Sequence, residues 1–452
     1  GKSEKSRVAL ELGLNETPEA AHAFLLAVGK WDEFINPHPL RAGCPLAPPR
    51  VPIGPDLDDV DRSDLSGQEA WAIDNAWSKD PDDAIGWDGE SVWVHVADPA
   101  AAILPDSPAD REAFARGSTL YLPELISPML SDEALDRFGL GLAPISPALS
   151  FRIGVAADGS ISRIEVMASR VSVRRLTYED ADALLDQGAL PGLAALADLA
   201  ALRAARRAAN GAVDIDIPEL RIRVDKGAEA GSRIEIRALA RTRSSSIVRE
   251  LMLLAGEAAA RWAFERALPF PYYGQEAPSE GGPASEGEGL AAQFARRRLM
   301  RSGVSGPTPT SHRGLGLPFY AQATSPLRRY QDLLGHMQIR ALLAGRPPLD
   351  ADEVGRRCAL AQAASAATRQ AERASDLHWK LAYLLGHPLW TGEGVIVASA
   401  GPGAWQVYIP ALGLETRVKA GSSRALDELL ELKAMRIDLP TLETSFDVAS
   451  PT

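Results

Sequence analysis

The sequence contains only two cysteines, Cys44 and Cys358, among its 452 residues. Two thiols can form neither a disulfide framework nor a zinc site built from several thiolates. Any metal is therefore expected to be a hard cation with oxygen ligands, such as Mg²⁺ or Mn²⁺. The sequence also lacks an apolar run near the ~18 residues of a membrane span. Residues 1–16 carry charges throughout and have no apolar segment typical of secretory signals, which predicts a cytoplasmic protein without a membrane partner.

Positive charge is also scarce, because 48 Lys and Arg residues stand against 60 Asp and Glu residues, for a net charge of −12. This balance argues against a protein that coats nucleic acid over its whole surface. The charge is nevertheless uneven: residues 51–90 hold twelve acidic and two basic side chains, whereas residues 291–346 hold nine arginines and one carboxylate. Two explanations stay open. Arginines could hold a polyanion beside a carboxylate-bound cation, or two solvated faces could simply attract one another.

Apolar and charged residues are both abundant, at 46% and 24% of the chain. This composition can bury large cores, so a mainly disordered chain is excluded. One hydrophobic core stops growing at roughly 250–300 residues, and a chain of this length therefore predicts about three domains. We expect a globular protein of the α+β class.

The pattern along the chain divides it into three regions. Residues 1–65 predict a small helical, helix-turn-helix-like domain followed by a proline-rich linker. Residues 66–386 mix strand and helix patterns and predict a large α+β domain, whereas residues 387–452 predict short strands with glycine-rich turns, as in an OB-fold β-barrel. Within the central region, helical patterns cover residues 193–207, 245–266, 325–344 and 350–385.

The densest acidic cluster consists of Asp74, Asp80, Asp82 and Asp83. Four ionised carboxylates so close in sequence repel one another strongly unless a cation or protons intervene. In extended chain Asp82 and Asp83 point to opposite sides, so Asp80 and Asp82 are expected to share one metal while Asp83 joins Asp74 on another. Two Mg²⁺ ions ~4 Å apart would suit in-line phosphodiester hydrolysis. The alternative is an acidic surface loop.

A second cluster lies in the segment Tyr320–Ile339. Ser325 and Pro326 form a helix-start signal, which predicts that Arg328 projects from the first helical turn, where free N–H groups favour an anion. Arg328 would then be a phosphate ligand. An ordinary helical ion pair between Arg328 and Asp332 is the alternative.

Together with the sequence GSTLYLPELISPML at residues 117–130, these two clusters resemble the catalytic RNB domain of the ribonuclease II and ribonuclease R family. The resemblance runs from about Trp71 to Leu385, and its motifs are specific in combination. It implies a bacterial, Mg²⁺-dependent 3′-to-5′ exoribonuclease, with Mn²⁺ as a substitute metal, that hydrolyses single-stranded RNA processively to nucleoside 5′-monophosphates. The C-terminal barrel would correspond to the S1-type OB-fold module of that family.

The resemblance also implies catalytic roles. Arg328 matches the arginine of the TSPxR motif, which holds phosphates near the 3′ end, and Tyr178 matches the tyrosine that positions the scissile nucleotide. The residues that match the acidic set, which binds magnesium and organises the attacking water, are Asp74, Asp80, Asp82 and Asp83.

Further matches imply contacts with the RNA strand. Tyr121 corresponds to the aromatic residue that stacks on the 3′-terminal base, and Glu250 to a glutamate of the helix that clamps the strand end. Glu372 corresponds to a residue that contacts the terminal ribose hydroxyls. Ile215 lies roughly where relatives carry a stacking phenylalanine, so one wall of the terminal-base site is expected to be aliphatic.

The N-terminal region departs from the resemblance, because relatives usually carry two β-rich cold-shock domains there. We hypothesise that a small helical domain widens the entrance and admits structured RNA with a short 3′ overhang. Two other functions stay open: a non-catalytic RNA-binding protein with the same fold, and a DNA-binding regulator acting through the N-terminal helices. The near balance of acidic and basic residues in that region argues against the second.

Overall fold

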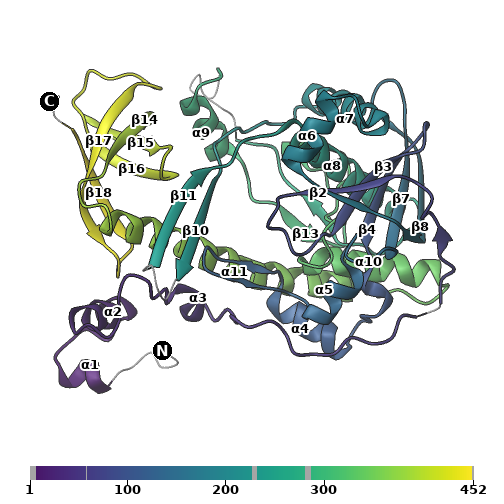
Figure 1. Cartoon of the computed structure of the whole chain (residues 1–452), viewed down its shortest axis with the longest axis horizontal. Coiled ribbons are helices and arrows are strands. Elements are labelled where there is room, and N and C mark those ends of the chain that lie inside the picture. The colour runs from purple at the N-terminus through teal and green to yellow at the C-terminus, as the bar shows by residue number, and fades with distance from the viewer. Residues whose placement is uncertain (1–6, 58, 227–231, 280–286, 450–452) are drawn as a thin grey trace.

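The structure is a computed structural model and describes residues 7–57, 59–226, 232–279 and 287–449. A large mixed body and a small β-barrel lie at opposite ends, and one long helix, α11 (Ala351–Leu385), runs from the body to the barrel (Figure 1). The carboxylate of Asp350 caps this helix by accepting a hydrogen bond from the Glu353 N–H, 2.8 Å away. The predicted mixture of helix and sheet is confirmed.

Three short helices form the N-terminal region: α1 (Arg7–Glu11), α2 (Pro18–Ala27) and α3 (His38–Arg41). The Thr17 hydroxyl caps α2 by accepting a hydrogen bond from the Ala20 N–H. Residues 42–62, where prolines are frequent, contain no regular element among those described. The predicted helical character is therefore confirmed, and the helix-turn-helix arrangement stays a prediction.

Buried histidines join this region to α11. The rings of His22 and His38 lie 6.3 and 5.5 Å from the ring of His378 on α11, between centroids. Burial, reinforced by the charge of Arg41, lowers the pKa of both His22 and His38 to about 4. Neutral imidazoles are thus enclosed where the N-terminal helices meet α11.

The body is built on a seven-stranded sheet with the strand order β1-β8-β7-β4-β3-β2-β9. Strand β1 pairs with β8, and β2 with β9, in parallel, whereas the other neighbours are antiparallel. Its strands are β1 (Ser63–Asp64), β2 (Ala70–Asp74), β3 (Asp83–Trp87), β4 (Val92–Ala97), β7 (Ser146–Val155), β8 (Ile161–Val171) and β9 (Arg174–Thr177).

Alternation along the strands gives the sheet two different faces. In β2, Trp71 and Ile73 face one core, and Ala70 and Ala72 face the other. The large side chains meet helices α6 (Tyr178–Asp186), α7 (Pro191–Ala209) and α8 (Arg243–Phe264). The alanines let helices approach closely on the opposite face, which is covered by η1 (Pro99–Ala101), α4 (Pro108–Arg116), α5 (Asp132–Phe138) and α10 (Tyr330–Leu343).

The start of α10 differs from the prediction. Residues 326–328 form a turn, and the helix begins at Tyr330 instead of after Ser325. The reason is a set of competing partners: Asp332 accepts a hydrogen bond from the Ser325 N–H at 2.8 Å, and the Leu327 N–H donates to Asp82 at 2.8 Å. Carboxylates brought by tertiary structure, and not a local cap, satisfy the backbone here.

The C-terminal region is a five-stranded antiparallel sheet in the order β16-β15-β14-β17-β18. Its edge strands β16 and β18 approach one another, so the sheet curls into a nearly closed barrel. Helix α9 (Leu290–Leu299) ties it to the body, because Phe294 packs on Tyr408 and Arg297 pairs with Glu415. The strands are β14 (Thr391–Ser399), β15 (Ala404–Ile409), β16 (Leu414–Lys419), β17 (Leu429–Asp438) and β18 (Glu443–Val448).

The remaining elements are three short two-stranded ladders and a turn of 3₁₀ helix. In the described residues no single helix is long and apolar enough to cross a membrane, although the pair α6 and α7, bent by 101°, passes that test jointly. These elements are β5 (Leu120–Tyr121) with β6 (Ile126–Ser127), β10 (Leu220–Lys226) with β11 (Ser232–Ala238), β12 (Tyr272–Gly274) with β13 (Val304–Gly306), and η3 (Arg313–Leu315).

Candidate active site

Two adjoining cavities open where the ends of β2 and β3 meet the turn before α10. One has a volume of about 250 Å³ and the other of about 230 Å³. Tyr178 lines the first cavity, and Asp80 and Tyr121 line the second. The two cavities share one set of charged side chains, which consists of Asp74, Asp82, Asp83 and Arg328.

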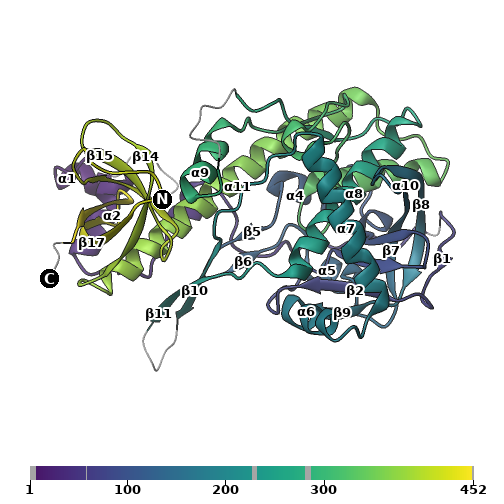
Figure 2. The same cartoon turned by 90° about the horizontal axis from the view of Figure 1, so that it is seen from above.

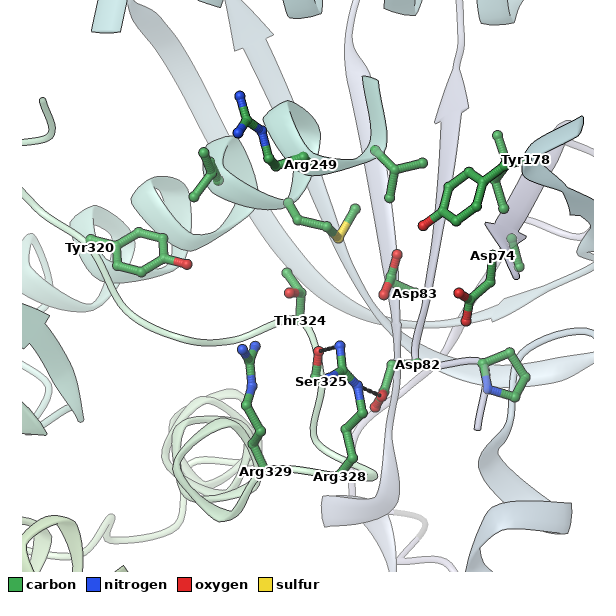
Figure 3. A pocket seen from close by; sticks show the side chains of 16 residues that line it. Asp74, Asp82, Asp83, Tyr178, Arg249, Tyr320, Thr324, Ser325, Arg328 and Arg329 are labelled. Carbon is green, nitrogen blue, oxygen red and sulfur yellow. Dashed lines mark hydrogen bonds and ion pairs between the residues drawn. The ribbon is translucent and has the colours of Figure 1, made fainter. Parts of the chain in front are cut away.

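The sheet itself brings the predicted residues together. Asp74 is the last residue of β2 and Asp83 the first of β3, the neighbouring antiparallel strand, so the connecting loop closes over the strand ends. Asp74 also pairs in register with Thr177, the last residue of β9. Tyr178 therefore starts α6 directly beside Asp74. In Figure 3 the Tyr178 hydroxyl and the carboxylates of Asp74 and Asp83 point into the same space.

Asp82 anchors the turn that carries Arg328. Its side chain is only 3% exposed, and its two oxygens accept hydrogen bonds from the Leu327 N–H at 2.8 Å and the Arg328 Nε at 3.0 Å. A second nitrogen of Arg328 donates to the Ser325 hydroxyl at 2.9 Å (Figure 3). Burial raises the pKa of Asp82 well above its ordinary value, and the Arg328 charge opposes that rise.

This geometry corrects the predicted setting of Arg328. The residue lies in a turn and not in the first turn of a helix, so free helical N–H groups do not supply its anion site. Its ion-pair partner is Asp82, and Asp332 pairs instead with Arg329 at 2.7 Å. The alternative of an i, i+4 pair between Arg328 and Asp332 is therefore wrong.

Asp80 and Tyr121 form a second linked pair. The Tyr121 hydroxyl donates a hydrogen bond to the Asp80 carboxylate, and the Tyr121 N–H donates to Glu372 on α11 at 2.9 Å. The Tyr121 side chain is 38% exposed, so its ring forms part of the cavity wall. Burial raises the pKa of Asp80, which the Tyr121 hydrogen bond counteracts. One tyrosine thus connects the acidic cluster to the predicted ribose contact Glu372.

The chemistry of the cluster fits a hard cation. Burial, with the nearby charge of Asp74, raises the pKa of Asp83 to about 7 against the pull of Arg328, so added positive charge would stabilise its ionised form. Within the described residues no three acidic, histidine or cysteine side chains already converge as a metal centre. Mg²⁺ is usually held by one or two carboxylates, with waters and substrate oxygens completing its shell.

The structure places three predicted RNA contacts outside the two cavities: Glu250, Ile215 and Glu372, of which Glu372 accepts a hydrogen bond from the Tyr121 N–H. Glu250 is 4% exposed and forms a two-pronged ion pair with Arg207, in which one hydrogen bond measures 2.9 Å. Ile215 is half-buried in a segment without regular structure. None of the three lines the two cavities described above, so their contacts with RNA stay predictions, and for Glu250 the ion pair would have to open.

Several residues of the larger cavity were not predicted from the sequence. Tyr320, Thr324 and Arg329 line it from the segment before α10, and Arg249 lines it from α8 (Figure 3). Thr324 is the first residue of the TSPxR motif that ends at Arg328, and Arg329 directly follows it, so the motif was the available signal for both. Nothing in the local pattern separates Arg249 from the other exposed arginines.

Clustered carboxylates, an arginine and a tyrosine at the end of a mixed sheet define a site suited to phosphate esters. Residues 62–345 match the RNB domain family, and the chain belongs to this family, whose members include ribonucleases II and R.

The chain is 32% identical to an uncharacterized ribonuclease of the cyanobacterium Synechocystis, in an alignment that covers 94% of this chain and 67% of the relative. It is 30% identical to the chloroplastic and mitochondrial ribonuclease II of Arabidopsis thaliana, over 82% of this chain and 49% of that protein. The chain thus spans about two thirds of the first relative and half of the second.

Solved structures share the fold at low identity. A ribonuclease R of Mycoplasma genitalium in complex with ribose-methylated single-stranded RNA has a TM-score of 0.74 at 20% identity, covering 86% of this chain and 72% of that one. The yeast protein Ssd1, described as a pseudonuclease, has a TM-score of 0.64 at 18% identity, covering 82% and 52%. The shared fold therefore does not by itself imply hydrolysis.

Proposed function

We propose that the protein is a hydrolytic 3′-to-5′ exoribonuclease that degrades single-stranded RNA processively to nucleoside 5′-monophosphates and requires Mg²⁺. The observation that carries this proposal is the convergence of four aspartates, Arg328 and Tyr178 on two connected cavities. The complete acidic set favours hydrolysis over a role limited to RNA binding. The alternative is a protein of the same fold that binds RNA without hydrolysing it.

Asp74 and Asp83 are the residues best placed to hold the cation, because Asp82 is engaged by Arg328 and Asp80 by Tyr121. A bound Mg²⁺ would polarise the scissile phosphate and make a water molecule more acidic. Arg328 is fixed by Asp82 and Ser325, so its charge is already in place to offset negative charge that develops on the phosphate oxygens. Because the guanidinium is already held in position, no further ordering of this side chain is needed when the reaction begins.

The two tyrosines have distinct roles in this proposal. Burial raises the pKa of Tyr178 and of Tyr121, so both hydroxyls stay protonated at neutral pH and act as hydrogen-bond donors. Tyr178 would donate to the scissile nucleotide. Tyr121 orients Asp80 while its ring offers a face to the 3′-terminal base, and stacking of this kind does not depend on base identity. Glu372, held by the Tyr121 N–H, would accept a hydrogen bond from a ribose 2′-hydroxyl and select RNA over DNA.

The other two regions extend the proposal. The barrel, with strand order β16-β15-β14-β17-β18 and adjacent edge strands, suits an S1-type OB-fold that contacts the strand. The N-terminal helices, in place of cold-shock domains, would widen the entrance for RNA with a short 3′ overhang. We also propose that the enzyme acts as a monomer in the cytoplasm, because the resemblance to the family implies an RNA channel formed within one chain.

The test is a gel assay of 5′-labelled single-stranded RNA with the wild type, Asp82→Asn and the exposed-site control Asp136→Asn, each with Mg²⁺ and with EDTA. We expect stepwise shortening from the 3′ end only for the wild type and the control, and only with Mg²⁺. RNA binding without shortening under any metal condition would replace the proposal with a non-catalytic role. A DNA-binding regulator would instead bind duplex DNA in a salt-sensitive manner through its N-terminal region.

A further inference from the structure

The β10–β11 hairpin lies between the body and the barrel (Figures 1 and 2). Residues at alternate positions of its strands face opposite sides. Ile222, Val224 and Ile234 pack with Trp379 and with Ala382 of α11, which fixes the inner face. The outer face then carries the residues at odd positions of both strands, and these are all charged.

The outer face contains one mismatched pair. In the strand register, Arg223 lies opposite Glu235 and Asp225 opposite Arg233, so both of these cross-strand pairs join opposite charges. The third pair places Arg221 directly opposite Arg237. Like charges in directly opposed positions destabilise a two-stranded ladder. The end of the hairpin formed by Arg221 and Arg237 therefore has an excess of positive charge.

Neighbouring carboxylates form ion pairs with Arg223 and Arg237 but not with Arg221. Arg223 pairs with Asp225 at 3.1 Å, and Arg237 pairs with Glu235 at 2.5 Å. Among the described residues Arg221 forms no ion pair. Partial burial and the charges of Arg223 and Arg237 lower the pKa of Arg221, and the charge of Glu235 opposes this lowering only in part.

Trp77 holds this uncompensated cation at the active site. The Arg221 Cζ lies 3.4 Å from the centroid of the Trp77 ring. Trp77 belongs to the loop between β2 and β3, is 39% exposed and lines the same cavity as Asp80 and Tyr121. A guanidinium stacked flat on an aromatic ring keeps its N–H groups directed outward in the plane, free to bind a phosphate in two-pronged fashion.

We propose that Arg221, held by Trp77, binds a backbone phosphate of the RNA strand as it enters the active site, with Arg237 adding to the positive potential. This inference rests on the proposed function and adds a positioning residue to it. The bound phosphate would relieve the repulsion between the two opposed arginines. Because the contact is to the backbone, it acts on every sequence and affects substrate binding instead of the hydrolysis step.

The test compares Arg221→Ala and Arg221→Lys with Arg223→Ala. The control removes the same charge from the same face of the same strand, at a position whose charge Asp225 already neutralises. Two measurements are made: steady-state kinetics on single-stranded RNA with Mg²⁺, and fluorescence anisotropy of labelled RNA in EDTA at several salt concentrations. Melting temperatures confirm that each variant is folded.

We expect Arg221→Ala to raise KM and Kd by about tenfold, to leave kcat unchanged, and to reduce the slope of log K against log salt by about 1. Arg221→Lys should give an intermediate value, because it keeps the charge and loses the planar group. Wild-type values for Arg221→Ala, or a loss no larger than that of Arg223→Ala, would overturn the contact. The binding measurement needs no hydrolysis, so an inactive wild type would refute the proposed function without deciding this inference.

Discussion

Replacing Arg328 by alanine is expected to destabilise the protein as well as to abolish activity. The substitution leaves the Asp82 carboxylate buried, at 3% exposure, with the Leu327 N–H as its remaining hydrogen-bond donor. Removing one partner of a fully buried ion pair costs about 3–5 kcal/mol. The Arg328 side chain is 39% exposed, so the interaction is partly screened, and we expect a loss of about 2 kcal/mol.

The substitution Asp82→Asn should have a different effect on stability. Asparagine keeps an oxygen that can accept the Leu327 hydrogen bond, and it removes the buried charge. Arg328 then loses its partner but can be hydrated, because it is partly exposed. We expect Asp82→Asn to lie within about 1 kcal/mol of the wild type, and the double variant to recover most of the stability that Arg328→Ala loses.

Thermal unfolding in EDTA measures this cycle without any contribution from bound metal. For a domain of this size about 2 kcal/mol corresponds to a fall in Tm of roughly 3 °C. All three variants should be inactive on RNA. The double variant should therefore be nearly as stable as the wild type and still inactive, which shows that the loss of activity does not result from unfolding. The reasoning fails if Arg328→Ala melts like the wild type, or if the double variant melts as low as Arg328→Ala.

Two further predictions concern buried groups outside the cavities. Glu250→Ala should lower the stability by about 3 kcal/mol, because Arg207 stays buried without its carboxylate; a loss of RNA affinity at unchanged Tm would instead support direct contact. Acid should detach the N-terminal helices from α11. The pKa values of His22 and His38 are near 6.5 in the unfolded chain and about 4 in the folded protein, so the folded state binds fewer protons. The stability of the folded state therefore decreases as the pH falls from 6.5 to 4. Fluorescence of Trp31, whose ring centroid lies 5.3 Å from that of His22, reports this change, and a flat signal across that range would contradict it.

The sequence identifies the residues of the site better than their local structure. The aspartates and Arg328 occur in short motifs, so their identity could be read directly. The helix start at Ser325 was predicted wrongly, because the partner that competes for the Leu327 N–H is Asp82, 245 positions away. Local signals describe only the near neighbours of a residue, and such a distant carboxylate lies beyond them.

The same limit applies to the surroundings of two predicted RNA contacts, Glu250 and Tyr121. Glu250 has the pattern of an exposed helix position, yet Arg207, 43 positions away on α7, encloses it in a buried ion pair. The hydrogen bond between the Tyr121 hydroxyl and Asp80 likewise depends on how the loop before β3 folds over the strand ends. In each case the residue type was predictable and its partner was not, because tertiary packing selects the partner.

The acidic segment 51–90 and the basic segment 291–346 interact in two ways, which correspond to the two explanations that the composition left open. Asp59 of the acidic segment pairs with Arg340 and Arg346 of the basic segment, each at 2.8 Å, which is simple attraction between two parts of the body. Asp82 and Arg328 come from the same two segments, but their ion pair lies at the wall of both cavities. The attraction that fastens the basic segment to the sheet therefore also delivers an arginine to the carboxylates, where a phosphate group needs it. A net negative charge is compatible with RNA as the proposed substrate, because Arg249, Arg328 and Arg329 line the larger cavity whatever the charge of the remaining surface.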